Sequence, residues 1–285
     1  MNVNKLKLNE PDYPKILRDL PAAPKELFWA GNPPAAWLDH PKVAIVGSRK
    51  ITPYGKAVTT KIAGDLAKAG VVIISGLAYG VDTTAHQAAL AANATTVAVL
   101  GTGINEIYPA AHSHIAEQIS VRGTIISEYP DGTPGFRSNF VVRNRIISGL
   151  CDVLIVAEAA LKSGSLHTAR FALEQGKTVM AVPGNITSPF SEGTNNLIKS
   201  GAIPVTSTED IFFALGLNPV SAKSQNFKGS ASEQTVLDYI KDGVTAQEDL
   251  ALATRLDSRR LASALTMLEI KGMIRPTGGG NWILA

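Results

Sequence analysis

The sequence is short of cysteine and has no long apolar run. Its 285 residues contain one cysteine, Cys151, which excludes an internal disulfide and a cysteine-rich zinc site and fits a reducing compartment. The N-terminal segment MNVNKLKLNEPDYP lacks the apolar core of a signal peptide, and no later segment reaches the roughly 18 apolar residues that span a bilayer. We therefore expect a cytoplasmic protein with no membrane partner.

The motifs that hold common nucleotide cofactors are also missing. No GxxxxGK[ST] segment occurs, and Gly47 is followed by SRKITPYG, which is not the GxGxxG fingerprint. The five histidines are scattered, and His112 and His114 form the one close pair, without an acidic partner nearby in sequence. We therefore expect no bound cofactor and no metal ion.

Charge is scarce and unevenly placed. Charged residues make up 18% of a chain that is 45% hydrophobic, an ordinary globular composition, and the formal net charge is +3. Residues 226–285 contain seven basic and seven acidic side chains, so the whole excess lies in the first 225 residues. If a polyanion binds, the larger N-terminal part is the better candidate.

Short β-branched and aliphatic runs alternate with amphipathic segments from Lys42 onward, which predicts an α/β domain with a doubly wound, mostly parallel sheet. The predicted strands are 43–46, 71–75, 96–100, 124–127, 153–157, 179–182 and 203–205. The predicted helices are 54–69, 82–92, 111–121, 140–150, 165–175, 193–200 and 208–215.

Three further segments flank this domain, which we assign to residues 42–217. Residues 1–41, rich in proline, are expected to pack on it as a lead-in with one short amphipathic segment, Pro14 to Leu20. The polar residues 218–232 read as a linker. Residues 233–285 have helical patterns at 233–241, 246–253 and 258–271, followed by two short strands around three glycines, which predicts a small winged-helix domain.

Glycine and serine recur just after the predicted strands, where a parallel sheet offers helix N-termini to an anion. The loops that could hold an anion are Gly47-Ser48-Arg49, Ser75-Gly76, Gly101-Thr102-Gly103, Ser163-Gly164-Ser165, Pro183-Gly184 and Gly193-Thr194-Asn195. Arg49 follows a buried strand directly, so it suits a phosphate; the alternative is an ion pair with Glu158 or Glu128.

The segment 137–168 combines cations, an aromatic ring and one of these loops. On a helix, positions two apart diverge by roughly 200°, so Arg143 and Arg145 should not do the same job. Arg143 shares a face with Phe140 and Ile147 and is our candidate for a phosphate contact. Arg145 is expected to anchor the helix to a carboxylate such as Glu158, or to reach the strand further along.

An ordered set of motifs between Lys42 and Gly216 resembles the DNA-processing protein A family, also called DprA or Smf. The motifs are IVGSRKITPYG, ISGLAYGVDTTAH, LGTGINEIYP, ISEYP, RNRIISGL, VLIVAEA, SGSLHTA, AVPGN and GTNNLI. The chain departs from the usual pattern at Phe140-Val141, where the family has Phe-Pro.

This resemblance implies a Rossmann-like core that binds single-stranded DNA without sequence preference, a homodimer, and loading of RecA onto incoming strands in natural transformation and homologous recombination. It implies no catalytic reaction. The expected nucleic-acid-binding residues are Gly47, Ser48, Arg49, Arg137, Phe140, Arg143, Asn144, Arg145, Ser163, Gly164 and Ser165, with Gly193, Thr194 and Asn195 as less certain members.

Two other functions have weaker support in the sequence. A related group of Rossmann-like hydrolases cleaves nucleoside monophosphates at the glycosidic bond and carries PGGxGTxxE, but Thr168 stands here where its carboxylate would be needed. Transcriptional regulation through the winged helix would rest on Arg259 and Arg260 in a domain of zero net charge.

An apolar cluster near the end of the core is a candidate dimer contact, because two adjacent phenylalanines on a short helix cannot both face one core. Its members are Ile211, Phe212, Phe213 and Leu215. The alternative is a helix buried between the domains.

Overall fold

The computed structural model describes residues 1–217 and 229–284, in two compact units that divide between residues 222 and 223. Each unit is described by itself. None of the helices in these ranges combines the length and the apolar character that a bilayer crossing requires.

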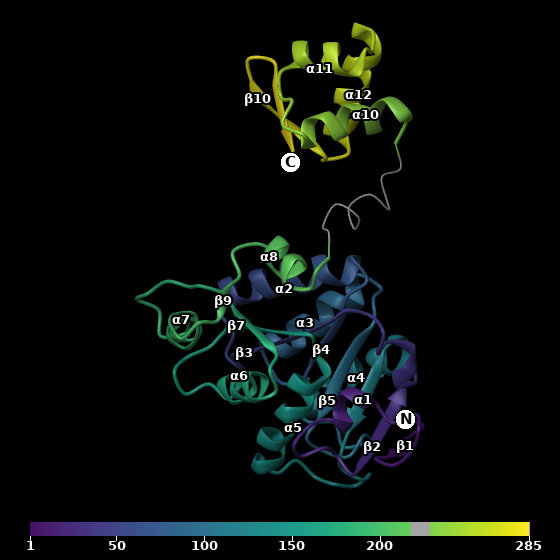
Figure 1. Ribbon diagram of the computed structural model, residues 1–285, viewed down its shortest axis with the longest axis vertical. Coiled ribbons are helices and arrows are strands. Elements are labelled where there is room, and N and C mark those ends of the chain that lie inside the picture. Colours follow the sequence, from purple (N-terminus) through teal and green to yellow (C-terminus); the bar gives the residue numbers. More distant parts are fainter. Residues whose placement is uncertain (218–228, 285) are drawn as a thin grey trace. The chain divides into compact units, whose positions relative to one another are not determined.

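The first unit is built on one nine-stranded sheet, which confirms the predicted α/β class (Figure 1). Seven strands are parallel, and β1 and β2 run antiparallel at one edge. In spatial order the strands are β1 (Asn4–Lys7), β2 (Glu26–Gly31), β6 (Thr124–Ser127), β5 (Thr96–Leu100), β4 (Val72–Ser75), β3 (Lys42–Gly47), β7 (Val153–Glu158), β8 (Thr178–Ala181) and β9 (Ile203–Pro204). Strand order reverses between β3 and β7, which is the position where doubly wound sheets bind ligands.

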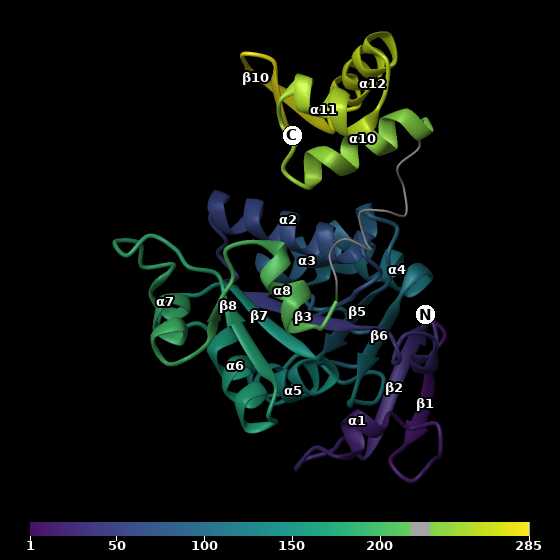
Figure 2. The same ribbon diagram turned by 45° about the horizontal axis from the view of Figure 1, so that its top comes forward.

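Helices cover both faces of this sheet (Figures 1 and 2). One face carries α2 (Pro53–Lys68), α3 (Val81–Ala91), α4 (Ser113–Arg122) and α8 (Thr208–Ala214). The other carries α1 (Lys15–Arg18), α5 (Arg137–Leu150), α6 (Ser165–Glu174) and α7 (Glu192–Lys199). The 3-10 turns η1 (Pro34–Ala36) and η2 (Ala110–His112) complete the unit.

The central strand β3 shows why its sequence is continuously apolar. Val43 and Ile45 pack with the helices of the first face, whereas Ala44 and Val46 pack with those of the second. All four side chains are buried, because a parallel strand in a three-layer fold has no solvent-facing side. The periodicity therefore revealed these strands with small errors at their ends.

The N-terminal residues do more than pack on the core. They supply the edge strand β1 and its neighbour β2, which sequence reasoning did not predict, and α1 lies within the predicted amphipathic segment. The Trp37 indole donates a hydrogen bond of 2.9 Å to the Thr124 hydroxyl of β6 and ties this segment to the sheet. Both strands are partly exposed, so their apolar pattern is weaker than that of the central strands.

The short helix α8 separates its two phenylalanines. Phe212 is buried with Ile211 in the core shared with α2 and α3, whereas Phe213 is 87% exposed. Ile211 and Phe212 therefore belong to the protomer's own core, and including them in the candidate dimer contact was wrong. Of the four residues in that cluster, Phe213 is the one strongly exposed apolar side chain.

The second unit is a winged-helix fold, as predicted. It contains α10 (Ala231–Lys241), α11 (Gln247–Thr254), α12 (Ser258–Ile270) and the antiparallel pair β10 (Ile274–Gly278) and β11 (Asn281–Leu284). The helix α10 begins two residues before the predicted domain start, because the Ser230 hydroxyl caps it by accepting the Glu233 N–H. Residues 218–228 of the predicted linker lie outside the described residues.

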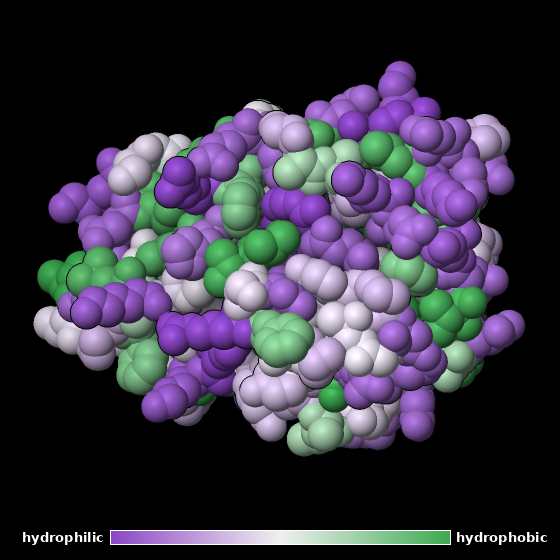
Figure 3. Space-filling model, turned by 90° about the horizontal axis from the view of Figure 1, so that it is seen from below, coloured by the Kyte–Doolittle hydropathy of each residue, from purple (hydrophilic) through white to green (hydrophobic). Residues whose placement is uncertain are grey.

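The surface is mainly hydrophilic on the face shown in Figure 3, where apolar side chains gather in several small, separate groups. The buried apolar residues of the first unit form three clusters in the layers between sheet and helices. Burial of that area is the main stabilising contribution to the fold.

Candidate nucleic-acid interface

A cavity of about 820 Å³ opens where the strand order of the sheet reverses. The loop after β3, the loop after β7 and one face of α5 enclose it. Its lining includes Gly47, Ser48, Arg49, Lys50, Asp82, Tyr108, Arg137, Phe140, Arg143, Asn144, Lys162, Ser163, Gly164, Ser165, His167, Thr168 and Phe190. Two of the predicted anion-binding loops, Gly47-Ser48-Arg49 and Ser163-Gly164-Ser165, are thus brought together in one concave site.

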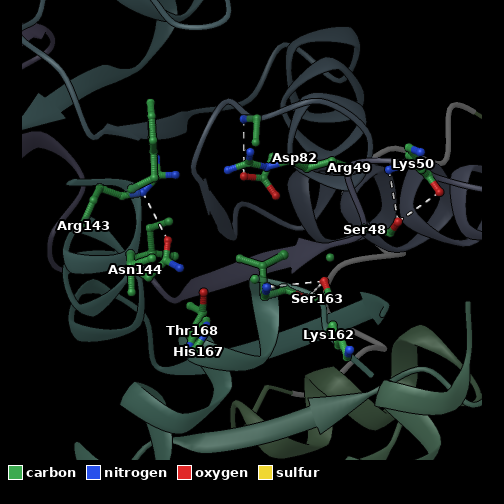
Figure 4. A pocket seen from close by; sticks show the side chains of 18 of the residues that line it. Ser48, Arg49, Lys50, Asp82, Arg143, Asn144, Lys162, Ser163, His167 and Thr168 are labelled. Atoms are coloured by element: carbon green, nitrogen blue, oxygen red, sulfur yellow. Dashed lines mark hydrogen bonds between the residues drawn. The ribbon is translucent and has the colours of Figure 1, made fainter. Parts of the chain in front are cut away.

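The lining is strongly cationic. Among the residues that the structure describes, five cationic side chains and a single carboxylate face this cavity, the cations being Arg49, Lys50, Arg137, Arg143 and Lys162. Figure 4 shows labelled members of this set approaching from the β3 loop, the β7 loop and α5. Concave sites lined by one sign of charge concentrate ligands of the opposite sign, so this arrangement favours a polyanion.

The loop after β3 is held in a fixed shape by its own polar groups. The Lys50 N–H donates to the Ser48 hydroxyl oxygen at 3.1 Å, and that hydroxyl donates to the Lys50 carbonyl at 2.9 Å. A side chain at Gly47 would lie 2.7 Å from the Glu158 carbonyl oxygen, so the backbones of β3 and β7 can approach only because this residue is glycine. The exposed Arg49 is therefore presented from a rigid loop.

The aromatic ring of Phe140 lies next to this arginine. The Arg49 guanidinium carbon is 6.0 Å from the centroid of the Phe140 ring, at the outer limit of a cation–π contact. The two carboxylates considered as ion-pair partners of Arg49 are engaged elsewhere. Glu158 accepts hydrogen bonds from the Thr52 backbone and hydroxyl, and Glu128 pairs with Arg145. Arg49 thus remains oriented toward the cavity.

The loop after β7 supplies hydroxyl groups at the start of α6. The Ser163 and Ser165 hydroxyl oxygens are 2.8 Å apart, and Gly164 occupies the N-cap position of a ten-residue helix. The positive end of a helix dipole stabilises an anion placed there. Nearby Lys162 adds a full charge to that partial one.

Arg143 forms part of the floor of the cavity and is 3% exposed. It donates to the Gly76 carbonyl oxygen at 2.8 Å and also to the Val99 carbonyl oxygen. Burial lowers the pKa of its guanidinium to about 10, so the group is still charged at neutral pH. This arginine supplies positive charge to the site while it holds α5 to the ends of β4 and β5.

Arg145 lies outside the cavity lining. It forms a close ion pair with Glu128, with 2.7 Å between the Nη2 and Oε2 atoms, and donates to the Ala22 carbonyl oxygen at 2.9 Å. The predicted divergence of the two arginines is therefore confirmed, but the partner is Glu128, and the proposed pairing with Glu158 was wrong. Its inclusion among the expected site residues is not supported by this position.

Asp82 is the one carboxylate among the described lining residues. It is buried at the start of α3, where it accepts hydrogen bonds from the Gly76 N–H at 3.1 Å and the Ala78 N–H at 3.4 Å. Burial raises the pKa of Asp82, and the nearby charge of Arg143 opposes that shift. The carboxylate thus fixes the loop after β4, on which Arg143 also rests.

The Gly193-Thr194-Asn195 segment is absent from the cavity lining. The Gly193 N–H donates to the Ala159 carbonyl oxygen at 2.8 Å, and the Asn195 amide bridges the N–H and C=O groups of Gly184. These contacts tie α7 to the ends of β7 and β8. The structure thus gives this segment a role in joining α7 to the sheet, and its part in the anion site stays a prediction.

Sequence reasoning missed Lys50, Lys162 and Tyr108 as lining residues. Both lysines adjoin loop residues that were predicted, so their position next to Arg49 and Ser163 was an available signal. Tyr108 lies in the loop after β5, within the motif LGTGINEIYP, and only the fold shows that this loop reaches the cavity.

Comparison with known proteins identifies relatives over nearly the whole chain. The profile of the family described as DNA recombination-mediator protein A matches residues 4–216, and that of the DprA winged helix domain matches residues 209–280. Protein Smf of Synechocystis is 40% identical over 227 residues, which cover 77% of this chain and 56% of that protein. The chain therefore spans little more than half the length of that relative.

Two solved structures are similar to the first unit. DNA processing protein A of Streptococcus pneumoniae superposes with a TM-score of 0.71 at 40% identity, covering 75% of this chain and 74% of that one. DNA processing protein A of Helicobacter pylori, studied for its single-stranded DNA binding mode, gives a TM-score of 0.68 at 35% identity, covering 75% and 96%.

Proposed function

Because the chain belongs to the DNA recombination-mediator protein A family, we propose that the first unit binds single-stranded DNA without sequence preference. The observation that carries this proposal is the cavity at the β3/β7 reversal, where five cations face one carboxylate beside an aromatic ring. Cations that contact phosphates give affinity without sequence information, and an aromatic face accepts any base. The Helicobacter pylori relative, studied for single-stranded DNA binding, supports the same ligand.

The site is proposed to bind rather than to catalyse. The carboxylates that a hydrolase would need are already engaged: Asp82 accepts two backbone N–H groups, Glu158 bonds to Thr52, and Glu128 is paired with Arg145. Thr168, at the position where hydrolases of the related group carry a carboxylate, is buried in the lining. Release of free base and ribose phosphate from a nucleotide would contradict this view.

Arg49 provides the direct test, because it is exposed on a rigid loop and the fold does not depend on it. Removing one cation that binds a phosphate of a single strand reduces the slope of log affinity against log salt by about 0.7. We expect Arg49→Ala to lower oligonucleotide affinity and to reduce this slope, measured by fluorescence anisotropy across a salt series. Arg170→Ala, which removes a 79% exposed arginine outside the cavity, is the matched control. Equal binding by both variants and the wild type would contradict the proposed site.

The biological role that we propose is loading of RecA onto the bound strand during recombination, in keeping with the family description as a recombination mediator. A homodimer is proposed as the active form. The decisive measurement is whether the protein accelerates RecA filament formation on strands coated with single-strand-binding protein. Unchanged filament kinetics would restrict the role to strand binding.

A further inference from the structure

Aromatic rings line one rim of the cavity beyond its cationic floor. Tyr108 is 53% exposed and Tyr79 is 49% exposed. A smaller pocket lined by both tyrosines shares Arg49, Phe140 and Arg143 with the main cavity, so the two adjoin. Half-exposed aromatic side chains next to a charged pocket are typical of a binding surface.

The rings are arranged as neighbours. The centroids of Tyr108 and Phe140 are 5.1 Å apart with an angle of 38° between their planes, and the Arg49 guanidinium carbon lies 6.0 Å from the Phe140 centroid. Three flat groups from three different loops and helices therefore meet at one rim. The Tyr79 ring packs edge-to-face against the His112 ring, with 4.8 Å between the ring centroids.

Phe140 is fixed in place by two glycines. A side chain at Gly101 would lie 2.8 Å from the Phe140 Cδ1 atom, and one at Gly135 would lie 3.0 Å from its Cζ atom. The ring thus occupies a slot that exists because both positions lack a Cβ. A ring that is already immobile loses little entropy when a ligand stacks on it.

The loop that carries Tyr108 is also anchored. The Gly103 N–H donates to the Thr133 carbonyl oxygen at 2.9 Å, and the Asn105 backbone and side-chain amides both donate to the Asp131 carboxylate. The position of Tyr108 is therefore set by the loop after β6 as well as by its own.

We propose that Tyr108 extends the aromatic face of Phe140 into a larger stacking site for unpaired bases of the strand whose phosphates occupy the cavity, with Tyr79 continuing it. This inference rests on the proposed function. Bases are the expected occupants because the rings lie next to the cations of the cavity. A single strand carries both phosphates and flat bases at regular intervals, so it can contact both groups at once. Tyr108 thereby becomes a binding residue of the rim.

The test compares two oligonucleotides of equal length, one homothymidine and one in which abasic sites replace the nucleosides. Loss of one stacked base lowers affinity roughly 5- to 150-fold. We expect Tyr108→Ala to show a loss in this range on homothymidine and none on the abasic strand, and Tyr108→Phe to retain wild-type binding. Tyr54→Ala is the matched control, since Tyr54 is 50% exposed but lines a different pocket.

The outcomes are distinguishable. Equal affinity of wild type and Tyr108→Ala for homothymidine would overturn the stacking site while leaving strand binding intact. An equal loss on both oligonucleotides would overturn it too, because the defect would then not involve bases. If the wild-type protein binds neither strand, the proposed function and the stacking site both fail.

Discussion

Gly76 determines whether the Arg143 guanidinium can lie against the end of β4. A Cβ atom added at this position would lie 2.6 Å from Nη2 and 2.7 Å from both Cζ and Nη1 of Arg143. A flexible side chain can usually move aside from such a contact at little cost. Here the guanidinium is buried and donates to the carbonyl oxygens of Gly76 and Val99, so movement breaks both hydrogen bonds.

The expected cost of Gly76→Ala follows from these contacts. A hydrogen bond to a charged group contributes about 1.5 to 3 kcal/mol to the free energy of unfolding. Replacing glycine by alanine restricts the unfolded chain, which stabilises the folded protein by about 0.4 to 1 kcal/mol. Because both hydrogen bonds are lost, we expect the free energy of unfolding to fall by about 2 to 5.5 kcal/mol, measured by urea denaturation with far-ultraviolet circular dichroism. For a unit of this size the melting temperature should fall by roughly 5 to 15 °C.

Two comparisons isolate the cause. Gly64→Ala lies within α2 with open space around its Cβ, so it should be neutral or stabilise the protein by up to about 1 kcal/mol. In an Arg143→Met background the guanidinium is absent, and Gly76→Ala should then cost little. A wild-type melting curve for Gly76→Ala, or the same loss in both backgrounds, would refute the reasoning.

Three further predictions concern titration, assembly and charge. His86 is fully buried, and burial lowers its pKa to about 3 from 6.5. Between these values the unfolded chain binds a proton at this residue and the folded protein does not, so the free energy of unfolding should fall by about 2 kcal/mol between pH 6.5 and 5. His86→Gln should remove that part of the pH dependence, whereas His114→Gln, at an exposed position, should not. Phe213→Glu places a charge on the exposed side of α8 and should shift sedimentation toward the monomer if this surface is the dimer contact; an unaltered dimer would exclude Phe213. Arg143→Met should lower oligonucleotide affinity with little change in its salt slope, because a buried guanidinium acts on the phosphates through its field, and a slope change as large as that of Arg49→Ala would contradict this view.

The sheet was predictable because its strands are buried on both faces. Runs such as 43–46 and 153–157 are continuously apolar, and glycine or serine marks the end of several strands. The strands β1 and β2 were not predicted, because partly exposed strands carry mixed side chains and the pairing of β2 with β6 is a long-range contact. Periodicity identifies which face of a segment is apolar, but it does not identify the neighbour that covers it.

Part of the site was predictable from the parallel topology of the sheet. Parallel topology places every loop that follows a strand at one edge, so Ser48 and Ser163 could be expected to meet at the reversal of strand order. The Gly193 segment has similar composition but lies beyond that reversal, where its backbone serves to join α7 to β7. Composition alone could not distinguish a loop at the reversal from one further along the edge.

For the two arginines of α5, helix geometry predicts that they point in different directions but not where each one points. Spacing gives the angle between Arg143 and Arg145, but not which of them faces the sheet, because each has Asn144 on one side and an apolar residue on the other. The partners of the two arginines differ. Arg145 pairs with the Glu128 carboxylate outside the cavity lining, whereas Arg143 donates to the carbonyl oxygens of Gly76 and Val99 and to the Asn144 side chain, with Asp82 further away. The field of a buried cation is neutralised less when no carboxylate is close to it. At an effective dielectric constant of 20, the attraction between two opposite unit charges about 8 Å apart is still roughly 2 kcal/mol. The buried arginine is therefore better placed to attract phosphates over the cavity as a whole, and the exposed Arg49 to contact one of them directly.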